Sequence, residues 1–330
     1  MQLNKIFSSH MVFAKGLPIR VYGEGEGVAK ITFAGKEKTV VANGDNWLIE
    51  FEPMEYGGPY VLEAVFEDSK VVLDDIYVGE VYLFAGQSNM QFKLGASTTP
   101  ESEYESNDML RLFSPDRIEK TDHYVASDGW VTCQKDFAEK WSALAYLAGN
   151  EIAKTKNVAI GIIVCYQGAS IIESWVPEGI LDEISKANNV QHPDHTYTMN
   201  GEWNTHGTLY SKVLSQAIPY SLTSAVWYQG ESDANLGESK VYADELCILI
   251  DTWRKDFMRE DLPFVIVQIA DYNNARDGQA WKNIQKAQID VLSMRDNLKG
   301  VISRDVCEND DIHPKTKAKL AHRIAAVLCE

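Results

Sequence analysis

The N-terminal part of the chain, from about Leu3 to Asp75, alternates hydrophobic and polar positions and contains frequent glycines. A period of two is typical of strands that bury one face. The alternation predicts strands at Ile19–Tyr22, Ala29–Phe33, Lys38–Val41, Trp47–Phe51 and Tyr60–Phe66. The segments GEGEG, NGDN and YGGP separate these strands and favour turns. We therefore expect a small antiparallel β-sandwich domain at residues 1–76.

Near Val78 the pattern changes to short, continuously apolar strands that alternate with amphipathic helices. The predicted strands are Val81–Ala85, Ala159–Val164, Ala225–Tyr228, Pro263–Gln268 and Gly300–Ser303. The predicted helices are Trp141–Lys154, Tyr242–Met258, Ala280–Leu292 and Ala318–Leu328. This alternation predicts an α/β domain at residues 77–330, with a parallel sheet covered by helices on both faces. Ligands of such sheets bind at the carboxyl ends of the strands.

Two polar segments interrupt this pattern. The acidic stretch Ser97–Asp128 is expected to form a loop. The stretch Asp182–Thr205 is rich in Asn, His and Asp, and we expect it to cap the site or to cover one of its rims.

Charge, cysteine content and the absence of long apolar runs narrow the expected partners, cofactors and location of the protein. The 330 residues include 48 acidic and 31 basic side chains, which gives a net charge of −17 and disfavours nucleic acid and anionic membranes as partners. The five cysteines are widely spaced and form no CxxC pair, so we expect free thiols and neither a disulfide framework nor a zinc site. The N-terminus has no signal-peptide core, and no apolar run approaches roughly 18 residues. These features predict a cytoplasmic protein and leave its oligomeric state open.

The first segment that could carry a catalytic residue is FAGQSNMQF, in which Ser88 follows the end of a predicted strand. A serine at that position is presented at the carboxyl edge of the sheet, where a neighbouring base could activate its hydroxyl. The alternative is a serine that caps the N-terminus of a helix. The segment does not match the GxSxG nucleophile elbow.

A second segment, ENDDIHP, precedes the last predicted helix. His313 is the best general-base candidate, since an aspartate three residues earlier can fold back to orient its ring. We favour Asp310 over Asp311 for that role because of this spacing. The alternative is an acidic cluster that complements the helix dipole.

Two further segments follow strands of the same sheet. Gln229, in WYQGESD, carries an amide that can donate to an oxyanion, and Gly168, in VCYQGAS, allows close approach to its backbone N–H. Either glycine-containing segment could instead be a simple turn. Together the four segments supply a nucleophile, a base, its orienting acid and oxyanion donors, which is the requirement for acyl transfer.

In this order, the four segments resemble those of the SGNH-hydrolase superfamily and, more narrowly, the sialate O-acetylesterase family of carbohydrate esterases. GQSNM, WYQGESD and DDIHP are similar to that family's blocks, and the N-terminal region resembles its β-sandwich. The resemblance implies an SGNH-type three-layer α/β/α sandwich with Ser88 as nucleophile, His313 as base and Asp310 as orienting acid. It also implies an oxyanion hole formed by the N–H groups of Ser88 and Gly168 and by the side chain of Gln229.

The resemblance further implies a serine esterase that removes acetyl groups from a carbohydrate without a metal or cofactor. Acetylated sialic acid and acetylated xylan fragments are both plausible substrates. Three departures, at Ala169 in the glycine block, Asp233 in the WYQGES block and Ala321 in the final helix, remove no catalytic group. A supporting or substrate-binding role is open for Glu231, Trp175 and Asn89. The alternatives are a non-catalytic carbohydrate-binding protein and an SGNH thioesterase or lipase that acts on another acyl group.

Overall fold

The computed structural model describes residues 1–44, 46–118, 129–188 and 201–330. Its strands are β1 (Gln2–Leu3), β2 (Val12–Ala14), β3 (Ile19–Glu24), β4 (Glu26–Phe33), β5 (Lys36–Asn43), β6 (Trp47–Phe51), β7 (Gly57–Val65), β8 (Lys70–Gly86), β9 (Asn107–Phe113), β10 (Val131–Cys133), β11 (Ile160–Tyr166), β12 (Ser224–Tyr228), β13 (Phe264–Val267) and β14 (Leu298–Val301). Its α-helices are α1 (Ser88–Gln91), α2 (Lys135–Ala138), α3 (Ala143–Lys156), α4 (Asp182–Asn188), α5 (Thr208–Lys212), α6 (Tyr242–Asp256), α7 (Gly278–Asp290) and α8 (Ala318–Cys329).

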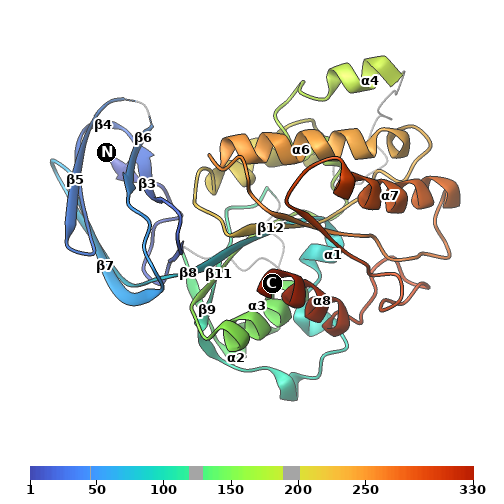
Figure 1. Cartoon of the computed structure of the whole chain (residues 1–330), viewed down its shortest axis with the longest axis horizontal. Coiled ribbons are helices and arrows are strands. Elements are labelled where there is room, and N and C mark those ends of the chain that lie inside the picture. Colours follow the sequence, from blue (N-terminus) through green and yellow to red (C-terminus); the bar gives the residue numbers. More distant parts are fainter. Residues whose placement is uncertain (45, 119–128, 189–200) are drawn as a thin grey trace.

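A central sheet with the strand order β10-β9-β11-β8-β12-β13-β14 organises the larger part of the chain. From β9 to β14 the neighbouring strands are parallel, and β10 pairs antiparallel with β9 at the edge. Helices α6 and α7 cover one face of this sheet, and α3 and α8 cover the other (Figure 1). The predicted α/β class is therefore confirmed, and the strands and helices predicted after Val78 lie close to their observed positions.

Helices α3 and α8 pack against each other on one face of the sheet and hold the C-terminal segment in place. Helix α3 begins after Ser142, whose hydroxyl accepts the N–H of Ala145 at 3.3 Å. Helix α8 buries Leu320, Ile324 and Leu328, and it packs along α3. This apolar contact anchors α8, and so it also anchors the segment that leads into it and carries His313.

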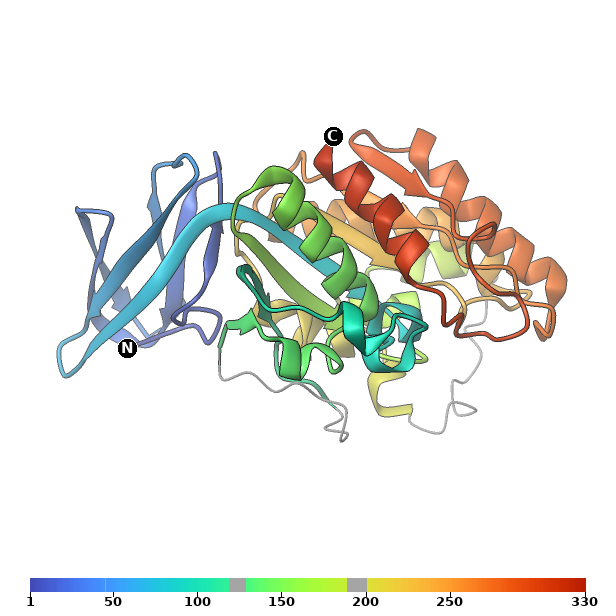
Figure 2. The same ribbon diagram turned by 90° about the horizontal axis from the view of Figure 1, so that it is seen from below.

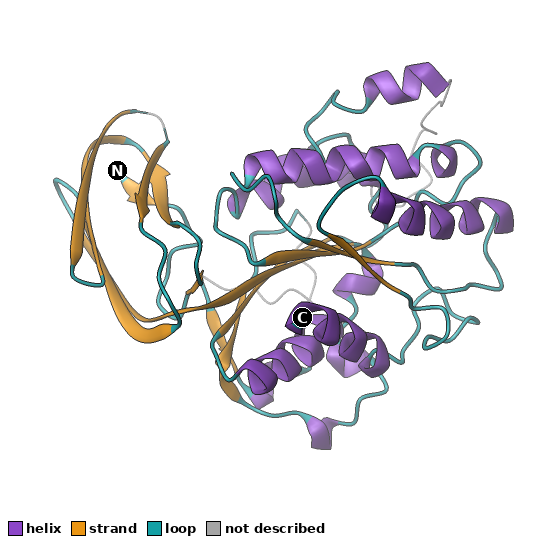
Figure 3. Cartoon of the chain, viewed as in Figure 1, coloured by secondary structure: helices purple, strands orange, loops and turns teal. Residues whose placement is uncertain are grey.

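The N-terminal strands form a second unit of structure without helices (Figure 3). Strands β1, β3 and β6 make a three-stranded antiparallel sheet, while β5, β4 and β7 lead across to β8. Edge-to-face ring contacts between Phe33 and Phe51, and between Trp47 and Phe66, join the two sets of strands.

Strand β8 belongs to both parts of the molecule (Figure 2). Its first half pairs antiparallel with β7 between Lys70 and Val78, and its second half pairs parallel with β11 and β12. The predicted boundary between residues 76 and 77 lies inside this continuous strand.

The expectation of a loop throughout Ser97–Asp128 is wrong, because β9 lies within that segment. Leu110, Leu112 and Phe113 are buried, and β9 lies between the edge strand β10 and β11 in the sheet. The acidic residues around this short apolar run hide its strand character. In the other polar segment, α4 forms at its start, while residues 189–200, on which the expected covering of the site depends, lie outside the described residues.

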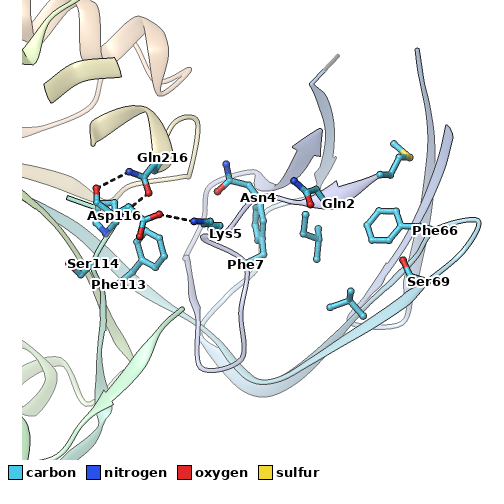
Figure 4. Close-up of a pocket in the computed structure, with 14 residues that line it drawn as sticks. Gln2, Asn4, Lys5, Phe7, Phe66, Ser69, Phe113, Ser114, Asp116 and Gln216 are labelled. Atoms are coloured by element: carbon cyan, nitrogen blue, oxygen red, sulfur yellow. Dashed lines mark hydrogen bonds and ion pairs between the residues drawn. The ribbon is translucent and has the colours of Figure 1, made fainter. Parts of the chain in front are cut away.

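A cavity of about 370 Å³ lies where the N-terminal strands meet the segment after β9 (Figure 4). At this junction Lys5 Nζ lies 2.7 Å from an Asp116 carboxylate oxygen, and Gln216 exchanges two hydrogen bonds with the Asp116 backbone. None of the predicted site residues lines the cavity, so it is separate from the site described below. Within the described ranges, no helix is both long and apolar enough to cross a membrane.

Candidate active site

The ends of three adjacent strands form the base of the site. Gly86, the last residue of β8, is in register with Tyr166 of β11 and with Tyr228 of β12. Its φ is +146°, and a Cβ at this position would lie 2.1 Å from the carbonyl oxygen of Tyr228, so only glycine fits. The three segments that follow these strands therefore begin at the same level, and in the first of them Ser88 is the first residue of α1.

Ser88 and His313 meet directly at this edge of the sheet. The distance between Ser88 Oγ and His313 Nε2 is 2.9 Å, although the two residues are 225 positions apart. Burial lowers the pKa of His313, the carboxylate of Asp311 raises it, and the ammonium of Lys317 lowers it further. The net downward shift favours the neutral imidazole, which is the form that can accept a proton from the serine hydroxyl.

The two aspartates before His313 have different surroundings. Asp311 accepts the backbone N–H of His313 at 2.9 Å and so caps the turn that holds the histidine. Asp310 is exposed. Within the described part of the chain, neither the Asp310 carboxylate nor His313 Nδ1 makes a hydrogen bond. The structure therefore does not bring the predicted orienting acid onto the ring.

Gly168 lies beside the nucleophile, as its sequence position predicts. A Cβ built on Gly168 would lie 3.7 Å from the Cβ of Ser88. The backbone N–H of Gly168 already has an acceptor, since it donates to Gln91 Oε1 at 2.8 Å. An amide carbonyl from α1 thus occupies this N–H group.

Gln229 is engaged elsewhere. Its side chain is fully buried, and Nε2 donates to the carbonyl oxygen of Ser170 at 2.9 Å and to the carboxylate of Asp233. Its Oε1 accepts the hydroxyl of Tyr242 at 2.8 Å. Both amide protons are therefore committed, and in this conformation the side chain has no proton left to donate to an oxyanion.

Behind the nucleophile, Asn89 hydrogen-bonds to three residues of two other segments. Its Nδ2 donates to Glu231 Oε1 at 2.7 Å and to the carbonyl oxygen of Ile312 at 3.0 Å. Its Oδ1 accepts from Lys317 Nζ at 2.7 Å. Burial raises the pKa of Glu231, while the Asn89 hydrogen bond and the Lys317 charge lower it. Asn89 and Glu231 therefore have a supporting place in this arrangement.

Trp175 belongs to the core. Its side chain is fully buried, packs edge-to-face against Trp227 with ring centroids 6.0 Å apart, and donates from Nε1 to Ser170 Oγ at 3.0 Å. A ring without exposed surface cannot stack on a sugar, so the structure contradicts a substrate-binding role for Trp175.

The side chains that commonly bind metal ions do not gather into a group within the described residues. In the portions of the chain that the structure covers, no group of three or more His, Cys, Asp or Glu side chains could hold a metal ion. All five cysteines are free thiols.

Two residues of the site were missed by the sequence reasoning. Gln91 follows Ser88 by three positions, and this helical spacing was the available signal that the two side chains lie near each other. Lys317 carries no comparable signal, because lysine is ordinarily exposed and its buried ammonium contacts Asn89 and Phe92, which are distant in sequence.

Comparisons with known proteins agree on one family. The family model described as carbohydrate esterase, sialic acid-specific acetylesterase matches residues 78–330. The sialate O-acetylesterases of Homo sapiens and Pongo abelii are each 25% identical to this chain over 326 residues, which cover 89% of it and 62% of the relative. The chain thus spans less than two thirds of the length of these relatives.

The solved structures include a carbohydrate acetylesterase from Xanthomonas citri with a TM-score of 0.84. It is 24% identical to this chain, and the match covers 98% of this chain and 73% of that one. At this level of identity, the likeness supports a shared α/β fold.

Proposed function

The chain belongs to the carbohydrate esterase family of sialic acid-specific acetylesterases, and on this premise we propose that it hydrolyses O-acetyl esters of a carbohydrate with Ser88 as the nucleophile. The observation that carries the proposal is the 2.9 Å contact between Ser88 Oγ and His313 Nε2 at the carboxyl edge of the sheet. A hydroxyl within hydrogen-bond distance of a neutral imidazole is the arrangement that nucleophilic catalysis requires.

In the first half of the reaction, Ser88 Oγ attacks the acetyl carbonyl carbon while His313 Nε2 takes the hydroxyl proton. The tetrahedral intermediate then collapses, the bond to the sugar oxygen breaks, and His313 returns its proton to that oxygen. In the second half, water gives its proton to His313 and attacks the acetyl group on Ser88. The bond between the acetyl carbon and Ser88 Oγ then breaks, acetate leaves, and His313 returns its proton to Oγ to restore the serine hydroxyl.

Negative charge on the carbonyl oxygen needs preorganised donors. We assign this role to the backbone N–H groups of Ser88 and Gly168, because Gly168 lies beside the serine. The amide of Gln91 must then release the Gly168 N–H when substrate binds. The side chain of Gln229 is left out of this assignment, since both of its amide protons are bound.

Asp310 remains our proposal for the acid that orients His313. Its carboxylate is exposed and makes no hydrogen bond to the described residues, so it is free to turn toward His313 Nδ1. Asp311 is less suited, because it already accepts the backbone N–H of His313.

The order of the sequence blocks supports the finer assignment as well. A parallel sheet with helices on both faces, and the Ser, Gly, Gln and Asp–His blocks in sequence order, fit an SGNH-type three-layer sandwich at residues 77–330. The names of the curated relatives make acetylated sialic acid the first substrate to test. Acetylated xylo-oligosaccharides, which the sequence resemblance also implies, are the second.

The test is acetate release from 9-O-acetylated sialic acid, acetylated xylo-oligosaccharides and an aryl acetate. We expect Ser88→Ala to abolish release while circular dichroism and urea unfolding match those of wild type. Ser293→Ala, at an exposed serine, is the matched control and retains activity. Acetate release by folded Ser88→Ala at the wild-type rate would refute the mechanism.

A further inference from the structure

We propose that Lys317 is a positioning residue for the esterase reaction proposed above: through Asn89, its buried ammonium locks the Ser88 segment to the His313 segment. This inference rests on the proposed function, because it assigns a task to Lys317 only if Ser88 and His313 react together.

The burial of Lys317 calls for an explanation. Its side chain has no exposed surface, although it lies immediately before α8, near the end of the chain. Its Nζ donates to Asn89 Oδ1 at 2.7 Å and lies 4.8 Å from the centre of the Phe92 ring. Moving an ammonium group out of water costs a large free energy unless partners compensate for it. The burial of this charge therefore indicates that it has a role at this position.

Asn89 makes the mechanical connection. It directly follows Ser88, and its Nδ2 donates to the carbonyl oxygen of Ile312, the residue before His313. The same Nδ2 donates to Glu231 in the loop after β12. Lys317 holds the other end of this amide and so fixes its orientation. An asparagine that lost its partner at Oδ1 could rotate, and both reacting side chains would lose their common support.

Burial and the neighbouring charges also determine the pH range in which Lys317 is charged. Burial lowers the pKa of Lys317 to about 8, against the opposing influence of Cys307, Glu231, Glu308 and Asp311. Below this pKa the ammonium is present, donates to Asn89 and lowers the pKa of His313. Above it, the lysine is neutral and both effects weaken. The proposal therefore predicts a bell-shaped kcat/KM profile: activity rises as His313 loses its proton and falls near pH 8 as Lys317 loses its own.

The experiment compares Lys317→Met with Lys315→Met, which removes the same charge at an exposed position two residues away. Aryl acetate hydrolysis is followed across the pH range, and folding is monitored by urea unfolding. We expect kcat of Lys317→Met to fall on the order of 10- to 100-fold with little change in KM, as a displaced reacting pair requires. The acid limb of the kcat/KM profile of this variant moves to higher pH, because the positive charge that disfavours the His313 imidazolium is gone. The alkaline limb near pH 8 disappears, because the group that titrates there is absent. Lys315→Met keeps the wild-type profile.

A second variant separates this role from simple stability. Lys317→Met combined with Glu231→Gln removes both buried charges, so the fold is not left with an unpaired carboxylate. We expect this double variant to regain the stability that Lys317→Met loses while keeping the lowered kcat and the displaced acid limb.

The outcomes are distinct. A folded Lys317→Met with the wild-type kcat and pH profile overturns the inference and leaves the proposed function intact. If neither variant folds, the wild-type profile still decides, since the absence of a fall in activity near pH 8 also overturns it. Wild-type acetate release that survives Ser88→Ala is instead a failure of the proposed function.

Discussion

Replacing Gln91 by glutamate tests whether the Gly168 N–H is an oxyanion donor. In the resting structure, Gln91 Oε1 accepts this N–H at 2.8 Å, so the ester carbonyl must displace a neutral amide to reach it. The variant Gln91→Glu keeps the length and shape of the side chain and replaces the amide by a carboxylate. The competitor for the Gly168 N–H then carries a negative charge.

The size of the effect follows from the hydrogen bond. A neutral hydrogen bond contributes about 0.5–1.5 kcal/mol, and one to a charged group contributes about 1.5–3 kcal/mol. The introduced carboxylate therefore holds the Gly168 N–H about 1–1.5 kcal/mol more tightly, which corresponds to a roughly five- to thirteenfold loss in kcat/KM. If the carboxylate never leaves, the donor is lost and the penalty approaches about 10²–10³-fold.

The assay is aryl acetate hydrolysis at neutral pH, with urea unfolding as the check on folding. Gln91→Leu removes the acceptor while keeping most of the bulk, and we expect its kcat/KM to stay near or above that of wild type. Gln279→Glu makes the same charge change at an exposed position on α7 and serves as the matched control. A folded Gln91→Glu with kcat/KM within about twofold of wild type would refute the assignment of Gly168 to the oxyanion hole.

Three further substitutions address the remaining assignments. Asp310→Asn should lower kcat by on the order of 10²–10⁴-fold if its carboxylate turns onto His313 Nδ1 during the reaction. Asp311→Asn should instead move the acid limb of the pH profile to lower pH, because the Asp311 carboxylate raises the pKa of His313; equal losses of kcat in both variants would contradict this division of roles. Trp175→Ala should lower the free energy of unfolding by roughly 3–5 kcal/mol, measured in urea, since the ring is fully buried. An unchanged unfolding free energy together with a raised KM for acetylated sugars would return Trp175 to the sugar site.

The strands and helices that carry the site follow from the hydrophobic pattern. Val81–Ala85 lies within β8, and the helix predicted at Tyr242–Met258 is α6 at Tyr242–Asp256. These predictions agree with the structure because a strand buried in a central sheet has a continuous apolar run, and a helix packed on the sheet has apolar residues at helical spacing. Strand β9 was missed because its buried residues form a short run between acidic neighbours, where local composition outweighs periodicity.

The polar contacts of the site could not be predicted in the same way. Whether the Gln229 amide faces a substrate or its own chain depends on Asp233 in its own loop and on Ser170, which the fold brings to it from the loop after β11. The burial of Lys317 likewise depends on how α8 packs, and no sequence period records that. Local spacing identifies which residue types stand at strand ends, but it does not determine which hydrogen-bond partner each side chain takes.

The nucleophile and the base are held in place by different parts of the fold. Ser88 is positioned by the sheet, because Gly86 in β8 is in register with β11 and β12 and allows a sharp exit from the strand. His313 lies on no strand and reaches Ser88 from the segment before α8, where it depends on Asn89 for its attachment to the nucleophile loop. The distance between the two reacting atoms is therefore set by a side-chain network as much as by backbone register. Substitutions in that network should impair catalysis at little cost to the sheet, whereas a side chain at Gly86 would disrupt the strand ends themselves.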